Sequence, residues 1–398
     1  MKGMYLNMNK MGFESKVWTA PRIYNVPDMD YNDVKAIYYD GLDYNNYKTR
    51  VFAYIGFPKS ASKSNKVPAI VLAHGGAGMA YPQWVEKWVE KGFAAIAMDL
   101  EGNISDSPGS YYSNKQPVDE QNKIMGGPSN LPLNGSSASP KNQWMYHAVA
   151  DTYLAHSLLA NDQRVDSSKI GICGISWGGI ITSVAISNSN CFAFAIPIYG
   201  CAYIKESKSL MIGNYPDNIF TNTMETTWET ETSKWLTLCK TPTLWINSDS
   251  DVAFSLDITT QTAQVTPNSN LCIIPNLLHS HEDGWNVLEA YSFALSILKS
   301  NKALATITKQ PTKDDMKVAF SVSKGVEIKS AYLVYRTDEL NYATNDNVMY
   351  YLIEKWNRID LQIINNEINV TPPEKAKMFY VNLVDNQGYI FSTQLAIL

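Results

Sequence analysis

The sequence predicts an α/β protein with a doubly wound, mostly parallel sheet, followed by an all-β, sandwich-like C-terminal domain. A continuous apolar run at 67–73 and a largely apolar one at 93–100 have the composition of strands that are buried on both faces. Apolar residues with helical spacing over 82–91 separate them, and strands and helices continue to alternate as far as residue 298. After Ser300 only short, often alternating strands follow.

The N-terminal region, residues 1–50, is predicted to be an arm. A strand-like run at 51–57 and a polar turn at 59–65 follow it. The N-terminus lacks the continuous apolar stretch of a secretory signal, and no run approaches the ~18 apolar residues of a membrane span. We therefore expect a soluble protein without a membrane span. The sequence leaves its compartment open, the periplasm and the exterior included.

The α/β domain is predicted to cover residues 51–300. Gly92 is expected to cap the helix at 82–91, because glycine readily takes the left-handed conformation that ends helices. The stretch 101–142 is rich in Gly, Ser, Pro and Asn, as long functional or mobile loops are, and 200–238 is interpreted as an insertion over the active-site face. Further helices are predicted at 144–159, 178–186 and 287–298, and further strands at 170–174, 192–198, 243–247 and 271–275.

The C-terminal domain is predicted to cover residues 301–398. A turn at 385–388 separates its last two strands. The domain could bind carbohydrate, pack against the first domain or mediate dimers, and we favour packing. Its strands are predicted at 317–324, 328–336, 348–356, 359–365, 377–384 and 389–397.

Composition excludes several classes of function. With 45% hydrophobic and 18% charged residues, the chain resembles an ordinary globular protein. A net charge of -5 without a basic run argues against a nucleic-acid partner. The 5 cysteines show neither a disulfide framework nor zinc-ligand spacing, and Cys173 is interpreted as a small core residue. We expect no metal and no cofactor, and the oligomeric state stays open.

The segment GISWGG, residues 174–179, carries the strongest chemical signal. It follows an apolar strand and precedes an apolar helical run, which is the context that a nucleophile elbow requires. In such a turn the serine backbone is strained, and flanking glycines remove Cβ atoms that would clash. The helix dipole also favours negative charge at this end of the helix. Ser176 is therefore the predicted nucleophile. The alternative interpretation is that this segment is an ordinary glycine turn without a catalytic role.

A general base is found by elimination among the histidines. In folds with this elbow the triad runs Ser, Asp or Glu, then His along the chain, and only His279 and His281 follow Ser176. We favour His281, which lies deeper in the loop and nearer the following helix. His279 is then expected to be structural, for example bonded to a backbone carbonyl. His147 and His156, on a predicted helix, are interpreted as surface or core residues.

The acid of the triad should follow the strand at 243–247, where Asp249 and Asp251 share one turn. Such a carboxylate holds the imidazole tautomer and stabilises the imidazolium. Motif spacing favours Asp251, which leaves Asp249 as a turn-capping residue. Asp257, in the next helix, is the less favoured alternative.

The oxyanion hole needs two N–H donors that point at the developing negative charge. One is predicted to be Trp177, the residue after the nucleophile. The other is expected from the loop after the strand at 67–73, which reads HGGAG and offers Gly76 and Ala77. This loop lacks the lysine of a P-loop and the spacing of a dinucleotide-binding turn, so a nucleotide role is disfavoured.

Together, HGGAG at 74–78, GISWGG at 174–179 and HSHEDGW at 279–285 resemble the α/β-hydrolase superfamily. Within it they are similar to the acetyl xylan esterase, dienelactone hydrolase and prolyl-oligopeptidase-like group. The resemblance covers roughly residues 50–300, and an appended β-domain is also familiar from bacterial members. The resemblance implies a triad of Ser176, Asp251 and His281. His281 is chosen because it is the second His of an H-x-H motif that precedes a Gly-Trp pair.

The chain also departs from its relatives. Cephalosporin-deacetylase-type enzymes carry Gln where this sequence has Trp177, and dienelactone hydrolases use Cys where it has Ser176. Residues 1–50 leave no room for the propeller of the prolyl oligopeptidases, which weakens the case for a peptidase.

The leading expectation is a serine carboxylic ester hydrolase that works through an acyl-enzyme, with a small-molecule or carbohydrate ester as substrate. An acetylated sugar is favoured by the resemblance and by aromatic residues of the insertion (Tyr203, Tyr215 and Trp228), which suit a core equally well. The alternatives are a peptidase with the same triad and a non-catalytic binding protein on a hydrolase scaffold.

Overall fold

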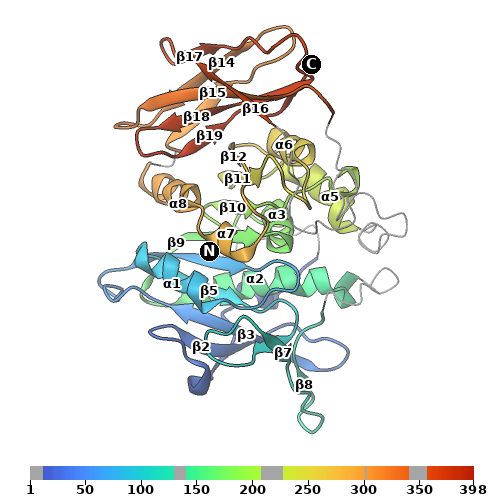
Figure 1. Cartoon of the computed structure of the whole chain (residues 1–398). Coiled ribbons are helices and arrows are strands. Elements are labelled where there is room, and N and C mark those ends of the chain that lie inside the picture. The colour runs from blue at the N-terminus through green and yellow to red at the C-terminus, as the bar shows by residue number, and fades with distance from the viewer. Residues whose placement is uncertain (1–11, 130–139, 208–226, 301–302, 340–355) are drawn as a thin grey trace. The chain divides into compact units, whose positions relative to one another are not determined.

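A computed structural model describes residues 12–129, 140–207, 227–300, 303–339 and 356–398. The chain divides into two compact units (Figure 1). The first consists of Met1–Gly200 with Asn222–Thr241, and the second of Cys201–Thr221 with Pro242–Leu398. The predicted domain boundaries at residues 50 and 300 remain predictions.

The sheet of the first unit is mainly parallel at its centre and antiparallel at one side. Its parallel strands, in spatial order, are β5 (Ala94–Met98), β4 (Val67–Ala73), β9 (Val165–Ile175) and β10 (Ala195–Ile198). Next to β5, antiparallel strands follow in the order β3 (Lys48–Gly56), β2 (Lys35–Asp40) and β1 (Ile23–Asn25). The predicted N-terminal arm therefore supplies strands to this sheet.

Helices cover this sheet, which explains the continuous apolar strand sequences. β5 is buried along its whole length. α1 packs against β3, β4 and β5 with Trp84 and Trp88 buried, while α2 and α3 pack against β9 and against each other. Gly92 follows α1 with φ 88°, as expected of a residue that ends a helix. The helices are α1 (Pro82–Glu90), α2 (Trp144–Asn161), α3 (Trp177–Asn188) and α5 (Thr227–Leu236).

The described part of the predicted loop 101–142 contains short strands. β6 (Asn103–Ser105) and β7 (Ser113–Lys115) form a hairpin, and β8 (Ile124–Met125) pairs with β3. Short 3-10 helices complete the described elements before residue 240: η2 (Ser15–Trp18), η3 (Pro27–Met29), η5 (Pro140–Asn142) and η6 (Ile204–Glu206). Tyr215 lies outside the described residues.

The second unit includes η6 and, from residue 242 on, starts with the parallel pair β11 (Thr243–Ser248) and β12 (Ser269–Ile274). A parallel pair requires a crossover, and α6 (Leu256–Val265) supplies it. The loop after β12 leads to α7 (His281–Trp285) and then to α8 (Leu288–Ser300).

Two antiparallel sheets follow, drawn in orange and red in Figure 1. One contains β13 (Ala305–Lys309), β14 (Lys317–Val322) and β17 (Glu367–Asn369). The other contains β16 (Asn357–Leu361), β15 (Ile328–Arg336), β18 (Met378–Asp385), β19 (Ile390–Ser392) and β20 (Ala396–Ile397). Residues of both sheets, Phe320 and Ile368 from one and Leu333 and Phe379 from the other, share one buried cluster. This is the sandwich core that the sequence predicts, and most of the predicted strand at 348–356 lies outside the described residues.

All five cysteines are buried free thiols, and burial raises the pKa of the Cys173 thiol. Cys173 lies in β9 as a core residue, in agreement with the sequence analysis. Among the described helices, none combines the length and the apolar character needed to cross a bilayer.

Candidate active site

Ser176 occupies a strained turn between β9 and α3. It is the N-cap of α3 and has φ 57° and ψ -118°, a conformation that side-chain-bearing residues rarely adopt. Its N–H donates to the carbonyl of Ile198 (2.9 Å), and its carbonyl accepts from the N–H of Gly179 (2.8 Å). The surrounding hydrogen bonds therefore hold the backbone in a conformation that it would otherwise leave. This is the geometry of a nucleophile elbow.

The glycines beside Ser176 are required by close backbone packing. A Cβ at Gly178 would overlap the carbonyl oxygen of Ala73 in β4, and one at Gly174 would overlap the carbonyl oxygen of Gly178. A Cβ at Gly179 would lie 2.8 Å from the Cα of Gly200. The turn is thus packed against the ends of neighbouring strands, where no side chain fits.

The HGGAG loop leaves the end of β4 and approaches the elbow. His74 fixes this loop, because its Nδ1 donates to the carbonyl of Gly75 (2.6 Å) while its Nε2 accepts from the N–H of Leu100 (2.9 Å). A Cβ at Gly76 would lie 2.6 Å from Cδ1 of Trp177. Two predicted oxyanion residues, Gly76 and Trp177, are therefore neighbours in space. Trp177 also begins α3, and the first N–H groups of a helix have no acceptor within the helix.

The indole of Trp177 is held by a second tryptophan. The rings of Trp144 and Trp177 meet edge to face with centroids 5.5 Å apart, and Trp144 Nε1 donates to the carbonyl of Leu100 (2.6 Å). Leu100 is also the residue that donates to His74. One short network thus connects the HGGAG loop, the start of α3 and the segment after β5.

Ala77 differs from Gly76 in what surrounds its N–H. Ala77 has φ 54°, and its N–H is among the groups that lower the pKa of the buried Glu101 carboxyl. Burial is the larger effect and raises that pKa, with His74 and Lys115 acting to lower it. The N–H of Ala77 therefore faces a carboxyl group of the protein, which favours Gly76 over Ala77 as the second oxyanion donor.

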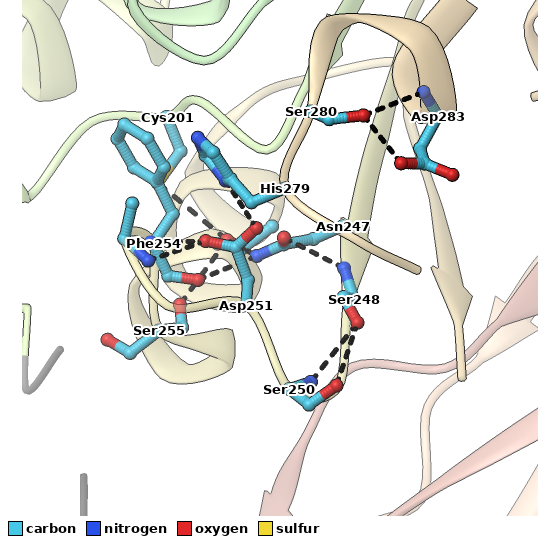
Figure 2. Close-up of polar contacts among 12 residues, drawn as sticks. Cys201, Asn247, Ser248, Ser250, Asp251, Phe254, Ser255, His279, Ser280 and Asp283 are labelled. Carbon is cyan, nitrogen blue, oxygen red and sulfur yellow. Dashed lines mark hydrogen bonds and ion pairs between the residues drawn. The ribbon is translucent and has the colours of Figure 1, made fainter. Parts of the chain in front are cut away.

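Asp251 and His279 form a buried acid–base pair in the second unit. His279 Nδ1 lies 2.7 Å from Oδ2 of Asp251, with the Asp251 side chain fully buried and the His279 side chain 13% exposed. Figure 2 shows the imidazole turned toward this carboxylate. The Phe254 ring stacks on the imidazole at an interplanar angle of 16°. This bond fixes the tautomer with the proton on Nδ1, which leaves Nε2 to act as a base.

The turn that carries Asp251 is held by its own hydrogen bonds. Asp251 Oδ1 accepts from the N–H groups of Ala253 (2.9 Å) and Phe254 (2.6 Å). Asn247, at the end of β11, donates through Nδ2 to the carbonyl of Phe254 (2.9 Å) and to Thr259 Oγ1 (2.7 Å). Both carboxylate oxygens of Asp251 are thus oriented by the fold, as a triad acid requires (Figure 2).

The histidine that the structure pairs with Asp251 is His279, whereas the sequence analysis favoured His281. His281 is the first residue of α7, and Ser280 caps that helix by accepting from the N–H of Asp283 (3.0 Å). Ser280 Oγ also bonds the carboxylate of Asp283, as Figure 2 shows. The capping residue lies between the two histidines, so His279 belongs to the loop and His281 to helix α7. Ser-x-x-Asp is a capping signature that could have indicated this from the sequence.

The remaining candidate residues have structural contacts. Asp249 accepts from the N–H of Asn276 (2.9 Å) and from the Tyr380 hydroxyl (3.1 Å). His147 Nε2 bonds the carbonyl of Lys141 (3.0 Å), and His156 Nε2 bonds the carbonyl of Cys191 (3.1 Å). Within the described ranges, no group of three or more His, Cys, Asp and Glu side chains could hold a metal ion.

Two family models match parts of the chain. The acetyl xylan esterase model matches residues 17–205, which include the HGGAG loop and the elbow. The prolyl oligopeptidase family model matches residues 138–283, which include the elbow and the Asp251–His279 pair. The chain is an α/β-hydrolase. Both models describe serine hydrolases, so this hydrolase is similar to the group that contains the acetyl xylan esterases and the prolyl oligopeptidases.

Solved structures confirm the fold of this α/β-hydrolase. Acetyl xylan esterase from Paenibacillus sp. R4 is 18% identical with a TM-score of 0.51, over 66% of this chain and 84% of that one. Acetyl xylan esterase 1 from Thermoanaerobacterium sp. JW/SL YS485 is 17% identical with a TM-score of 0.51, over 71% and 92%. No curated protein sequence matches the hydrolase.

Proposed function

We propose that this hydrolase is a carboxylic ester hydrolase in which Ser176, His279 and Asp251 form the catalytic triad. The observation that carries the proposal is the 2.7 Å bond between His279 Nδ1 and the buried Asp251 carboxylate. The three residues occur in the chain order Ser, Asp, His that enzymes with this elbow use. The strained backbone of Ser176 supports its role as nucleophile.

The proposed reaction proceeds through an acyl-enzyme. Ser176 Oγ attacks the ester carbonyl while His279 Nε2 takes the hydroxyl proton, and His279 then gives that proton to the leaving alcohol. Water attacks the acyl group in the second half, and the acid product leaves after the proton returns to Ser176. Asp251 keeps the Nδ1 proton in place and stabilises the imidazolium in both halves.

The N–H groups of Trp177 and Gly76 are proposed to form the oxyanion hole. The two residues are neighbours in the first unit, because the Trp177 indole packs against Gly76, and they follow the ends of the parallel strands β9 and β4. A rigid pair of donors stabilises the developing oxyanion without reorganisation during the reaction. Removal of one such donor in a serine hydrolase costs roughly 10²–10³ in kcat.

The proposed substrate class is an acetylated carbohydrate. The acetyl xylan esterase model covers the HGGAG loop, the segment after β5 and the elbow, which are the parts that would surround a bound acyl group. An acetyl group needs little room, in keeping with the partly buried Trp144–Trp177 pair, in which Trp177 directly follows Ser176.

The test compares soluble acetyl esters with aminoacyl anilides as substrates for the wild type and Ser176→Ala. We expect the wild type to hydrolyse p-nitrophenyl acetate and acetylated xylo-oligosaccharides, and Ser176→Ala to lose at least about 10³ in kcat. Ser187→Ala is the matched control, since Ser187 lies in the same helix and donates to the carbonyl of Val184 (2.8 Å). Equal rates for wild type and Ser176→Ala would refute the assignment.

A peptidase is the second candidate function. The prolyl oligopeptidase family model supports it, because its match extends through the elbow to the Asp251 and His279 loops. The same triad would serve, with an amine as the leaving group in place of an alcohol. Turnover of aminoacyl anilides without turnover of acetyl esters would establish this function in place of the first.

A further inference from the structure

A second buried carboxylate, Asp249, lies two residues before the proposed triad acid. Its side chain connects three parts of the second unit. Asp249 Oδ1 accepts from the N–H of Asn276 (2.9 Å), and its Oδ2 accepts from the hydroxyl of Tyr380 (3.1 Å). Asp249 is 3% exposed and Tyr380 is fully buried. The bond to Tyr380 is therefore shielded from water, where such bonds are strongest, and the bond to Asn276 is partly buried.

The bond to Asn276 joins the acid loop to the base loop. Asn276 lies three residues before His279 and has φ 57°, a left-handed conformation. Asp249 and Asp251 belong to one turn, so a single carboxylate fixes the turn of Asp251 relative to the loop of His279. The distance between the acid and the base thus depends on a residue that touches neither.

The bond to Tyr380 joins the same turn to the C-terminal sandwich. Tyr380 belongs to β18, and Trp356 beside it donates through Nε1 to the main-chain carbonyl of Asp249 (2.9 Å). The rings of Trp356 and Tyr380 meet edge to face at 5.4 Å, and the guanidinium of Arg336 lies 5.5 Å from the Trp356 ring centroid. The turn that carries the triad acid is therefore held by two side chains from residues 301–398.

Additional bonds between β12 and the sandwich fix Tyr380 relative to this turn. Asn382, two residues after Tyr380, donates to the carbonyl of Ile273 (2.9 Å), and Ser392 Oγ accepts from the N–H of Ile273 (2.7 Å). Ile273 lies in β12, three residues before Asn276. The sandwich thus holds the strand that leads into the base loop as well as the acid turn.

We propose that Asp249 and Tyr380 are positioning residues of the triad, and that the C-terminal sandwich holds Asp251 and His279 in reactive geometry. The proposal rests on the catalytic role assigned above to Asp251 and His279. It extends that role by giving the sandwich a part in catalysis. Misplacement of a catalytic group by about 1 Å can cost roughly 10²-fold in rate.

The test measures kcat and KM with p-nitrophenyl acetate for Tyr380→Phe, with active sites counted by fluorophosphonate titration. Counting active sites separates loss of rate from loss of folded enzyme. The matched control is Tyr332→Phe, which removes another buried hydroxyl in the same sheet. The Tyr332 hydroxyl accepts from Asn382 (3.2 Å) and does not bond Asp249. We expect Tyr380→Phe to lower kcat per active site about 10- to 100-fold with KM within threefold, and Tyr332→Phe to leave kcat unchanged.

Asp249 provides a second comparison. Asp249→Asn keeps an acceptor for Asn276 and can donate to the Tyr380 oxygen, so it should retain kcat within about threefold, whereas Asp249→Ala should lose as much as Tyr380→Phe. If Tyr380→Phe does not fold, Trp356→Phe gives the same readout, because it removes the donor to the Asp249 carbonyl. Wild-type kcat per active site in folded Tyr380→Phe and Asp249→Ala, with His279→Ala inactive, would overturn the positioning role alone. Full activity of Ser176→Ala and His279→Ala would instead overturn the triad.

Discussion

Replacement of Asp251 by Asn tests the proposed triad through the tautomer of His279. Asp251 Oδ1 accepts two N–H groups, from Ala253 (2.9 Å) and Phe254 (2.6 Å). In Asp251→Asn the amide oxygen must stay at this position, because an NH₂ group there would face two donors. The amide nitrogen then faces His279 Nδ1, which must become an acceptor. The ring proton moves to Nε2, the nitrogen that should take the proton of Ser176.

The magnitude follows from this inversion. A histidine with the wrong tautomer cannot act as a base, and the corresponding change in a serine-protease triad lowers kcat by about 10⁴. That factor corresponds to about 5 kcal/mol of transition-state stabilisation. The substitution preserves volume and both hydrogen bonds of Oδ1, so we expect KM and the unfolding midpoint to change little.

The assay is steady-state hydrolysis of p-nitrophenyl acetate with purified enzyme. Asp257→Asn serves as control, because Asp257 is a nearby carboxylate in the first turn of α6 that accepts from its neighbour Ile258. We expect this control to retain kcat within about threefold, since one charge at a helix terminus contributes only about 0.3–1 kcal/mol. A kcat for Asp251→Asn within tenfold of wild type would refute the tautomer argument.

Two further predictions concern stability. Gly178→Ala places a Cβ against the carbonyl oxygen of Ala73, and neither backbone can move away, so urea unfolding should show a free energy of unfolding lower by about 3 kcal/mol or more. Gly127→Ala is the control, because a Cβ there meets nothing within 4 Å. Equal unfolding midpoints for Gly178→Ala and Gly127→Ala would contradict the packing argument. Burial lowers the pKa of His156 to about 4, below its unfolded value of about 6.5. The stability that the neutral, buried His156 contributes is therefore complete above pH ~6.5. It is lost as the pH falls toward 4, which lowers the free energy of unfolding by up to about 3 kcal/mol. His156→Gln, which keeps a donor for the Cys191 carbonyl, should flatten this part of the pH–stability curve, and an unchanged slope would contradict the assignment.

The local pattern of the sequence was sufficient to predict the strands and helices around the elbow. Apolar runs identify β4 and β5 because both faces of these strands are covered, and the glycines around Ser176 indicate the tight turn that the structure contains. The antiparallel strands β1 and β2 were not predicted, because β1 is a three-residue edge strand and β2 has only a short apolar run between charged residues.

The choice between two histidines was harder, because His279 and His281 share one short loop. What separates them is the Ser280 cap, which starts α7 at His281 and leaves His279 to face Asp251. The contact between Asp249 and Tyr380 joins residues 131 positions apart. No local pattern encodes such a contact, and only the folded chain reveals it.

The most direct measurement is the rate at which a fluorophosphonate modifies Ser176 in wild type, His279→Ala and His281→Ala, with the adduct located by peptide mass spectrometry. A phosphonate reports the nucleophilicity of the serine and does not depend on the natural substrate. If His279 activates Ser176, wild type and His281→Ala should react at similar rates, while His279→Ala should react at least about 10³-fold more slowly. Fast modification of His279→Ala together with loss of reaction in His281→Ala would contradict the triad.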